Sequence, residues 1–239
     1  GRPYQTRSSW YRSAFFYRIL ESKIYVISHQ PSSSINNFQE VDKIKQKQIR
    51  EQFKLPQKYI FYPAMYLPHK NHKTLIDSLK ILRSDFKMDL NIVFTGKDSG
   101  NLNNLKKYAA RKKLNDCIYF LNFVENDYLP YLYLDAFVLT MISMAGPTFI
   151  PPWEAFKMEV PVIYSELDGA KEVYGNAVHY TDALDSASIA KAIKEIYENE
   201  ELRLNLVING KKLLKQIEAQ NDYRKLFEII NNYRKLKEN

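Results

Sequence analysis

From Lys58 onward, strand-like and helix-like segments alternate regularly, and this alternation limits the folds that the chain can adopt. Short apolar runs of strand length recur about six times, and stretches with helical spacing of apolar residues separate most of them. Parallel strands need a crossover of this length, usually a helix, whereas antiparallel strands do not. The alternation therefore predicts an α/β fold, a Rossmann-like doubly wound parallel sheet with helices on both faces.

The predicted elements can be given by residue number. Strands are expected at 59–62, 90–95, 118–121, 136–140, 161–164 and 177–180, with an earlier strand-like run at 24–28. Helices are expected at 13–23, 41–53, 72–83, 101–113, 127–134, 151–158, 186–198, 200–216 and 222–236. The polar stretch 30–37 is rich in breaker residues and is the best linker candidate. Ligands of doubly wound sheets bind at the carboxyl ends of the strands, so the loops after strands are the ones to search.

Composition excludes several classes of protein. No apolar run approaches the ~20 residues that span a bilayer, and the start of the chain lacks the pattern of a secretory signal peptide. The single cysteine, Cys117, cannot form an internal disulfide, which favours a reducing cytoplasmic setting. Four histidines and one cysteine argue against a structural metal site.

The net charge of +8 suits an anionic partner such as a nucleotide diphosphate, a nucleic acid or an acidic membrane face. Most basic residues alternate with apolar ones at helical spacing, so solvated helix faces explain most of them. The sequence has no aromatic and basic signature of an RNA-binding sheet. We therefore expect no nucleic-acid partner.

The loop after the first strand of the regular pattern runs from Pro63 to His72 and leads into a helix. Lys70 lies just before that helix, whose N-terminus offers unpaired N–H groups and partial positive charge. A lysine in this position suits a diphosphate clamp, and a surface lysine in a turn is the open alternative. His69 and His72 are interpreted as turn and cap residues, because no third metal ligand is evident.

The loop after the second strand, Gly96–Gly100, contains two glycines and a lysine. It does not fit the phosphate-binding pattern G-x-x-x-x-G-K-[ST], because the lysine follows the first glycine. We predict a plain turn into the next helix.

The loop after the fourth strand, 146–155, is rich in glycine and proline. The backbone N–H groups of Thr148, Phe149 and Ile150 would face the N-terminus of the next helix and form an anion site. Glu154 lies one turn inside, where a carboxylate can accept two ribose hydroxyls. The alternative is a glutamate that only complements the helix dipole, worth a few tenths of a kcal/mol. Motifs for a serine hydrolase, a zinc protease or a dinucleotide oxidoreductase are absent from the sequence.

Residues 58–216 resemble the C-terminal domain of family-4-type glycosyltransferases, also called glycosyl transferases group 1, which have the two-domain GT-B architecture. Four segments carry the likeness in family order: 62–72, 118–133, 146–161 and 161–173. The fold that this implies is the C-terminal half of a GT-B fold, which binds the sugar donor.

The resemblance implies a role for individual residues. Lys70 would contact the donor diphosphate, Glu154 would bind the ribose, and backbone N–H groups of residues 148–150 would hold the diphosphate and sugar. Phe123 and Val124 would border the base. The complete donor-binding set is Met65, Lys70, Phe123, Val124, Gly146, Pro147, Thr148, Phe149, Ile150 and Glu154.

Two positions depart from the family pattern. Gly146 stands where the first glutamate of the E-x7-E motif is expected, and Met65 stands where an arginine usually precedes the lysine by five residues. The loop resembles a branch of the family that reads G-P-T-x-I-P-P-x-E-A, in which the glycine is normal. Lys70 is then the main cationic clamp.

The resemblance also implies an activity and partners. A hexose, mannose or rhamnose in this branch, would pass from a nucleotide-diphosphate sugar to a glycan or lipid-linked acceptor, with retention and without a metal. The expected setting is surface-polysaccharide or lipopolysaccharide biosynthesis in the cytoplasm, with peripheral association at the inner face of the membrane as an option. A non-catalytic nucleotide-sugar-binding subunit that needs a separate acceptor-binding partner is the alternative.

The resemblance predicts that the chain is divided into three parts. Residues 1–40 would be a remnant of an N-terminal Rossmann domain and a linker, and 41–218 the donor-binding domain. Residues 219–239 would be a C-terminal helix that packs on the N-terminal domain, with Leu226, Phe227 and Ile230 on its apolar face. The catalytic residues are expected in that N-terminal domain, so we expect residues 1–239 alone to be inactive.

Overall fold

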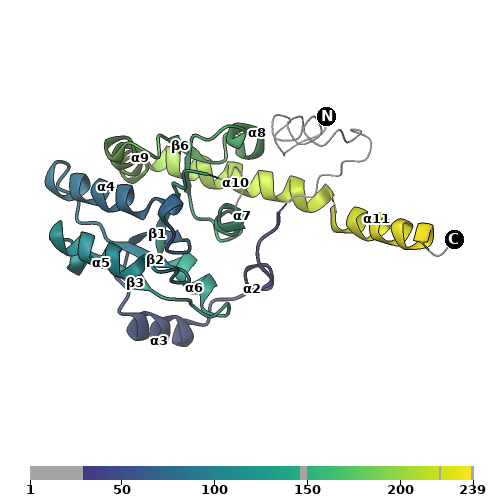
Figure 1. Cartoon of the computed structure of the whole chain (residues 1–239), viewed down its shortest axis with the longest axis horizontal. Helices are drawn as coiled ribbons and strands as arrows, with labels where there is room; N and C mark the ends of the chain where they lie inside the picture. Colours follow the sequence, from purple (N-terminus) through teal and green to yellow (C-terminus); the bar gives the residue numbers. More distant parts are fainter. Residues whose placement is uncertain (1–28, 146–149, 221, 238–239) are drawn as a thin grey trace.

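The computed structural model describes residues 29–145, 150–220 and 222–237, and a six-stranded sheet forms its centre (Figure 1). Every strand pairing is parallel, in the order β3-β2-β1-β4-β5-β6. The strands are β1 Tyr59–Pro63, β2 Ile92–Thr95, β3 Ile118–Leu121, β4 Ala136–Met141, β5 Val162–Ser165 and β6 His179–Thr181. The prediction of a doubly wound parallel sheet is confirmed.

Burial along the strands explains why these segments pair in the middle of the fold. β2 and β5 are buried at every residue, and β1 and β4 at every residue but one. The edge strands β3 and β6 each have partly exposed residues. Continuous apolar runs are typical of parallel strands covered on both faces, so the sequence pattern reports the central position of β1, β2, β4 and β5.

The helices follow the strands and cover the sheet. Their bounds are α2 Ser33–Asn36, α3 Lys43–Phe53, α4 His72–Ser84, α5 Leu102–Arg111, α6 Leu129–Leu134, α7 Ile150–Lys157, α8 Ala170–Tyr174, α9 Ser186–Glu198, α10 Glu200–Gln220 and α11 Asp222–Lys237. Helix α4 packs against α5 and α9, whereas α7 packs against β4 and α10. The strand order reverses at β1, so right-handed crossovers before and after β3 lie on opposite faces.

Two short helices were not predicted. Helix α8 has five residues and follows Gly169, whose φ of 82° suits glycine. Helix α2 lies in the stretch 30–37 that we interpreted as a linker, and its Ile35 is fully buried. The predicted helix 13–23 and strand 24–28 lie outside the described residues.

The long helix α10 crosses the body of the molecule and contacts both α9 and α7. Gly210 sits where α10 meets α7, and a Cβ atom there would lie 2.4 Å from Cδ1 of Phe156. Helix α11 then runs out beyond the sheet (Figure 1), with Phe227 65% and Ile230 40% exposed. Within the described ranges, every helix is too short or too polar to cross a membrane.

Candidate functional site

The strand order places a topological switch point between β1 and β4, where the loops that follow these strands diverge. The two loops are joined by hydrogen bonds. The carbonyl oxygen of His69 accepts from the Met144 N–H at 2.9 Å and from Ser143 Oγ at 3.3 Å. Asn71 Nδ2 donates to the carbonyl of Ile142 at 3.3 Å. The carboxyl end of the sheet therefore brings the Lys70 loop beside the start of the glycine- and proline-rich loop.

Lys70 ends a short 3-10 helix, Pro68–Lys70, and Asn71 then turns the chain in the left-handed region with φ 60°. Tyr62 Oη donates to the Lys70 carbonyl, which fixes the turn to the sheet. The lysine side chain is partly buried, and desolvation lowers its pKa below the ordinary value. A partly desolvated cation beside the α4 N-terminus fits the predicted diphosphate contact.

His72 begins α4 but does not cap it, because Asn71 occupies the N-cap position. The imidazole is 2% exposed and packs among three aromatic rings, with centroid distances of 5.0 Å to Tyr62, 5.3 Å to Tyr66 and 5.0 Å to Phe94. Neither ring nitrogen makes a well-aligned hydrogen bond to the described residues. Burial lowers the pKa of His72 to about 4, a shift that the nearby Ala64 carbonyl offsets in part and the Lys70 cation increases. This neutral ring packs against the strands β1 and β2 directly after the Lys70 loop ends.

The loop after β2 turns into α5 as predicted, but it also forms an isolated parallel bridge between Asp98 and Tyr66. Asp98 Oδ1 accepts from the N–H groups of Gly100, Asn101 and Leu102 at 2.8, 3.2 and 3.2 Å, so a carboxylate already occupies the start of α5. A Cβ atom on Gly96 would lie 2.3 Å from the Ala64 carbonyl oxygen. This glycine is needed because the loops after β1 and β2 touch there.

The loop after β3 contains the two residues predicted to border the base. Thr95 Oγ1 donates to the carbonyl of Asn122 at 2.9 Å, which ties this loop to the end of β2. Phe123 is 71% exposed and Val124 is 7% exposed. An exposed aromatic ring beside a buried aliphatic side chain offers a flat surface for stacking.

The first residue of α7, Ile150, is 44% exposed, and Met65 in the loop after β1 is 42% exposed. Both lie on the carboxyl side of the sheet with Phe123. The predicted positions Gly146, Pro147, Thr148 and Phe149 lie outside the described residues.

Glu154 lies one turn inside α7 and is only 4% exposed, so other residues of the chain surround its carboxylate. Glu154 Oε2 accepts from Tyr133 Oη at 2.8 Å, and Oε1 accepts from the Ser32 N–H at 3.3 Å. Neither partner was found from the sequence, since Ser32 is 122 positions away and Tyr133 is 21. Glu154, the residue predicted to bind the ribose, is thus held by Tyr133 of α6 and by Ser32, which directly precedes α2.

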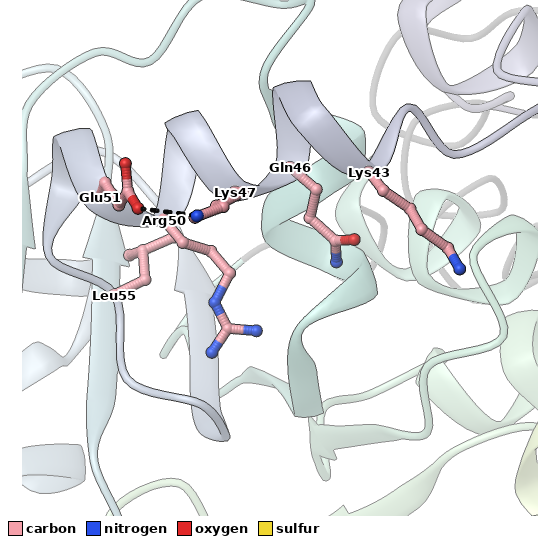
Figure 2. A pocket seen from close by; sticks show the side chains of 6 residues that line it. All are labelled: Lys43, Gln46, Lys47, Arg50, Glu51 and Leu55. Carbon is pink, nitrogen blue, oxygen red and sulfur yellow. Dashed lines mark ion pairs between the residues drawn. The ribbon is translucent and has the colours of Figure 1, made fainter.

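A groove lies away from this site, on α3 (Figure 2). It is an open groove of about 480 Å³, lined by Lys43, Gln46, Lys47, Arg50, Glu51 and Leu55. Lys47 pairs with Glu51 at 3.9 Å, and both Gln46 and Arg50 reach Asp135 just before β4. Burial raises the Asp135 pKa, while Arg50 and Gln46 act in the opposite direction. The groove lies at the amino end of the sheet, and its polar groups fasten α3 to the start of β4.

Metal ligands do not gather anywhere in the described part of the chain: no three His, Cys, Asp or Glu side chains lie close enough to hold an ion.

Residues 43–213 match the sequence model of the family described as glycosyl transferases group 1. The O-antigen chain mannosyltransferase RfbU of Salmonella typhimurium is 27% identical over 175 residues, which cover 73% of this chain and 47% of that protein. The chain thus spans about half the length of this curated relative.

Solved structures show the same fold. A structure of Anabaena Alr3699/HepE in complex with UDP superposes with a TM-score of 0.75 at 17% identity, covering 96% of this chain and 63% of that one. The C-terminal domain of a glycosyl transferase group 1 family protein, LpcC from Francisella tularensis, gives a TM-score of 0.63 at 18% identity, covering 77% of this chain and 97% of that domain. Since the family match covers most of the chain and the structures share its sheet, this chain belongs to the glycosyl transferases group 1 family, with the fold of a GT-B glycosyltransferase.

Proposed function

We propose that this chain is the donor-binding half of a retaining glycosyltransferase. It would bind a nucleotide-diphosphate sugar at the switch point and transfer the hexose once joined to an acceptor-binding N-terminal domain. The observation that carries the proposal is the junction of two loops: the His69 carbonyl holds the loop after β4 against the loop that ends at Lys70. Family membership and the UDP bound to a protein of the same fold support this assignment.

The proposed contacts follow the donor from base to sugar. Phe123 and Val124 border the base, Glu154 accepts ribose hydroxyls, and Lys70 faces the diphosphate. The backbone of residues 146–150 and the Met65 side chain border the sugar. Residues 41–218 form this donor domain, with 1–40 as a linker and remnant and 219–239 as the helix that returns to the N-terminal domain.

Leaving-group stabilisation would be the contribution of this half to catalysis. Breaking the sugar–phosphate bond leaves negative charge on the diphosphate, and preorganised N–H dipoles with a partly desolvated ammonium stabilise such charge. The position of Lys70, partly buried beside the N-terminus of α4, supports this role. A metal ion would then be unnecessary.

Calorimetry with UDP, GDP and dTDP tests donor binding. We expect one of these nucleotides to bind, and Lys70→Ala to weaken that binding by about tenfold to a hundredfold, the loss of one charge-assisted contact. Lys73→Ala is the matched control, because this exposed lysine lies in the first turn of α4, directly after the Lys70 loop, but places its ammonium over the Tyr108 ring of α5. Addition of EDTA should leave the affinity unchanged. Absence of binding at millimolar concentration for all three nucleotides would sink the proposal.

The sugar and acceptor belong to the same proposal. Mannose is the first candidate because RfbU is named a mannosyltransferase of O-antigen chains, with rhamnose second. The acceptor would be a surface-polysaccharide glycan or its lipid-linked form, reached from the cytoplasm at the inner face of the membrane. NMR of the product made by the complete enzyme tests retention, since an inverted anomeric configuration would contradict it.

One observation favours a second candidate, a non-catalytic nucleotide-sugar-binding subunit. Met65 leaves an exposed apolar side chain where the family places an arginine, which removes a charge from the diphosphate side. Turnover by the chain joined in one polypeptide to its N-terminal domain would exclude this candidate. Donor binding without turnover in that protein would favour it.

A further inference from the structure

The surroundings of Glu154 differ between its two carboxylate oxygens. The Oε2 atom accepts a 2.8 Å hydrogen bond from the Tyr133 hydroxyl. The Oε1 atom accepts a 3.3 Å hydrogen bond from the Ser32 N–H, at the long end of the range for such bonds. A carboxylate held firmly at one oxygen and loosely at the other can exchange only the loose partner at low cost.

Tyr133 is the rigid partner. Its side chain is fully buried, and its ring packs edge-on against Phe61 of the central strand β1 at a centroid distance of 5.0 Å. Burial and the neighbouring carboxylate raise the Tyr133 pKa well above its ordinary value, so the hydroxyl keeps its proton and remains a donor. The hydrogen bond therefore fixes the Glu154 carboxylate to the sheet.

Ser32 is the replaceable partner. It precedes the four-residue helix α2, which contacts α6 and α7 but is no part of the sheet. Its backbone N–H reaches the carboxylate from a segment that belongs to neither α6 nor α7.

We propose that Tyr133 is a positioning residue for donor recognition: it fixes one oxygen of Glu154 and directs the other to the ribose, a place that Ser32 fills in the absence of nucleotide. The inference rests on the proposed function, because it assumes that Glu154 receives the ribose. Tyr133 itself touches no donor atom. It acts by restricting the rotation of the buried carboxylate.

The test compares each ribonucleoside diphosphate with its 2′-deoxy analogue: UDP with dUDP and GDP with dGDP. Calorimetry on the whole chain gives the ratio of the two dissociation constants, which measures ribose recognition apart from base and phosphate contacts. We expect the wild-type protein to prefer the ribose form and Tyr133→Phe to reduce that preference by about tenfold, the loss of a hydrogen bond to a charged group. Glu154→Gln should reduce it as well, and adding Tyr133→Phe to Glu154→Gln should reduce it no further.

Tyr59→Phe is the matched control. Tyr59 is also fully buried, and its hydroxyl donates to the Leu132 carbonyl at 2.7 Å without touching Glu154. Each variant removes a buried hydroxyl that donates a hydrogen bond, so both lose stability, but only Tyr133→Phe should change the ribose preference. Equal preferences in Tyr133→Phe and the wild-type protein would overturn the positioning role while leaving donor binding intact.

A second variant acts in the opposite direction and does not depend on the folding of Tyr133→Phe. Ser32 has φ −59° and ψ 157°, which proline adopts readily, so Ser32→Pro removes the competing N–H with little strain. We expect Ser32→Pro to raise the ribose preference several-fold. An unchanged or lower preference would overturn the exchange at Oε1. Wild-type protein that binds dTDP but none of these four nucleotides would overturn this inference alone, and wild-type protein that binds neither dTDP nor any of the four would overturn the proposed function with it.

Discussion

His72 shows how a buried polar side chain can contribute to a site without touching a ligand. Its imidazole fills an aromatic cage below the Lys70 loop, and neither nitrogen has a well-aligned partner among the described residues. Such a ring packs like a phenyl group as long as it stays neutral. Protonation would place an unpaired charge beside Lys70, which is costly in a dry environment.

This residue makes the stability of the fold depend on pH. The folded-state pKa of about 4 is below the ordinary value of 6.5, so between these values the unfolded chain binds a proton that the folded chain does not. His72 therefore leaves the free energy of unfolding unchanged above about pH 6.5 and lowers it as the pH drops from 6.5 toward 4. We expect His72→Phe to be near neutral at pH 7.5 and to stabilise the protein by about 2 kcal/mol relative to wild type at pH 5.

Urea unfolding of both proteins at pH 7.5 and pH 5 measures this difference. The other described histidines stay in both proteins, so their titration cancels. Equal losses of stability in the two proteins on going to pH 5 would show that His72 takes up a proton in the folded state.

Gly210 is the residue on which the contact between α10 and α7 depends. The Cβ atom of alanine would meet the Phe156 ring at 2.4 Å, and that ring is held by Trp153 at 5.6 Å and Tyr174 at 6.2 Å between centroids. The overpacking cost of about 1–3 kcal/mol exceeds the gain in helix propensity of up to about 1 kcal/mol.

We therefore expect Gly210→Ala to lower the free energy of unfolding although alanine favours helices. Denaturant unfolding measures it, and the difference between Lys212→Gly and Lys212→Ala on the exposed side of α10 is the control that isolates helix propensity. Adding Phe156→Leu to Gly210→Ala should recover part of the loss. A more stable Gly210→Ala protein would show that the α10–α7 contact can relax.

Most element boundaries were predicted to within about two residues where apolar residues recur at helical spacing or form a continuous run; for example, the strand expected at 90–95 begins at Ile92. The runs that form β1, β2, β4 and β5 are continuously apolar because both faces are covered, and the stripe of α9 was found with its observed bounds of Ser186–Glu198. Helix α8 was missed because five residues carry no period. The partners of Glu154 were missed because a contact between Ser32 and α7 depends on three-dimensional packing, which leaves no local pattern.

For the molecule as a whole, α11 is the helix that extends beyond the sheet (Figure 1). Of the three residues on its predicted apolar face, Phe227 is 65% and Ile230 40% exposed, whereas Leu226 is partly buried. We expect Phe227→Ser together with Ile230→Ser to change the free energy of unfolding of this chain by less than about 0.5 kcal/mol.

The comparison variant is Ile217→Ser, since Ile217 is fully buried near the end of α10. It should lose several kcal/mol, as expected for a polar group placed in a packed core. Thermal unfolding distinguishes the two cases, and a large loss in the α11 double variant would show that this apolar face is covered within the chain. If our assignment of the N-terminal domain is right, the same double variant should bind that domain, supplied separately, more weakly than wild type does.

The order of the strands also has a kinetic consequence. The central strands β1 and β4 are separated in the sequence by β2, β3 and their helices. Pairing them closes a long loop of chain, which costs conformational entropy and makes this pairing slow to form. The loops that meet at His69 and Met144 are the direct continuations of these two strands. Their junction should therefore form late, with the central pairing, and partly folded chains should have no affinity for a nucleotide. A nucleotide that binds there would slow global unfolding as well as steady its own loops, because opening the junction would require separating the middle of the sheet.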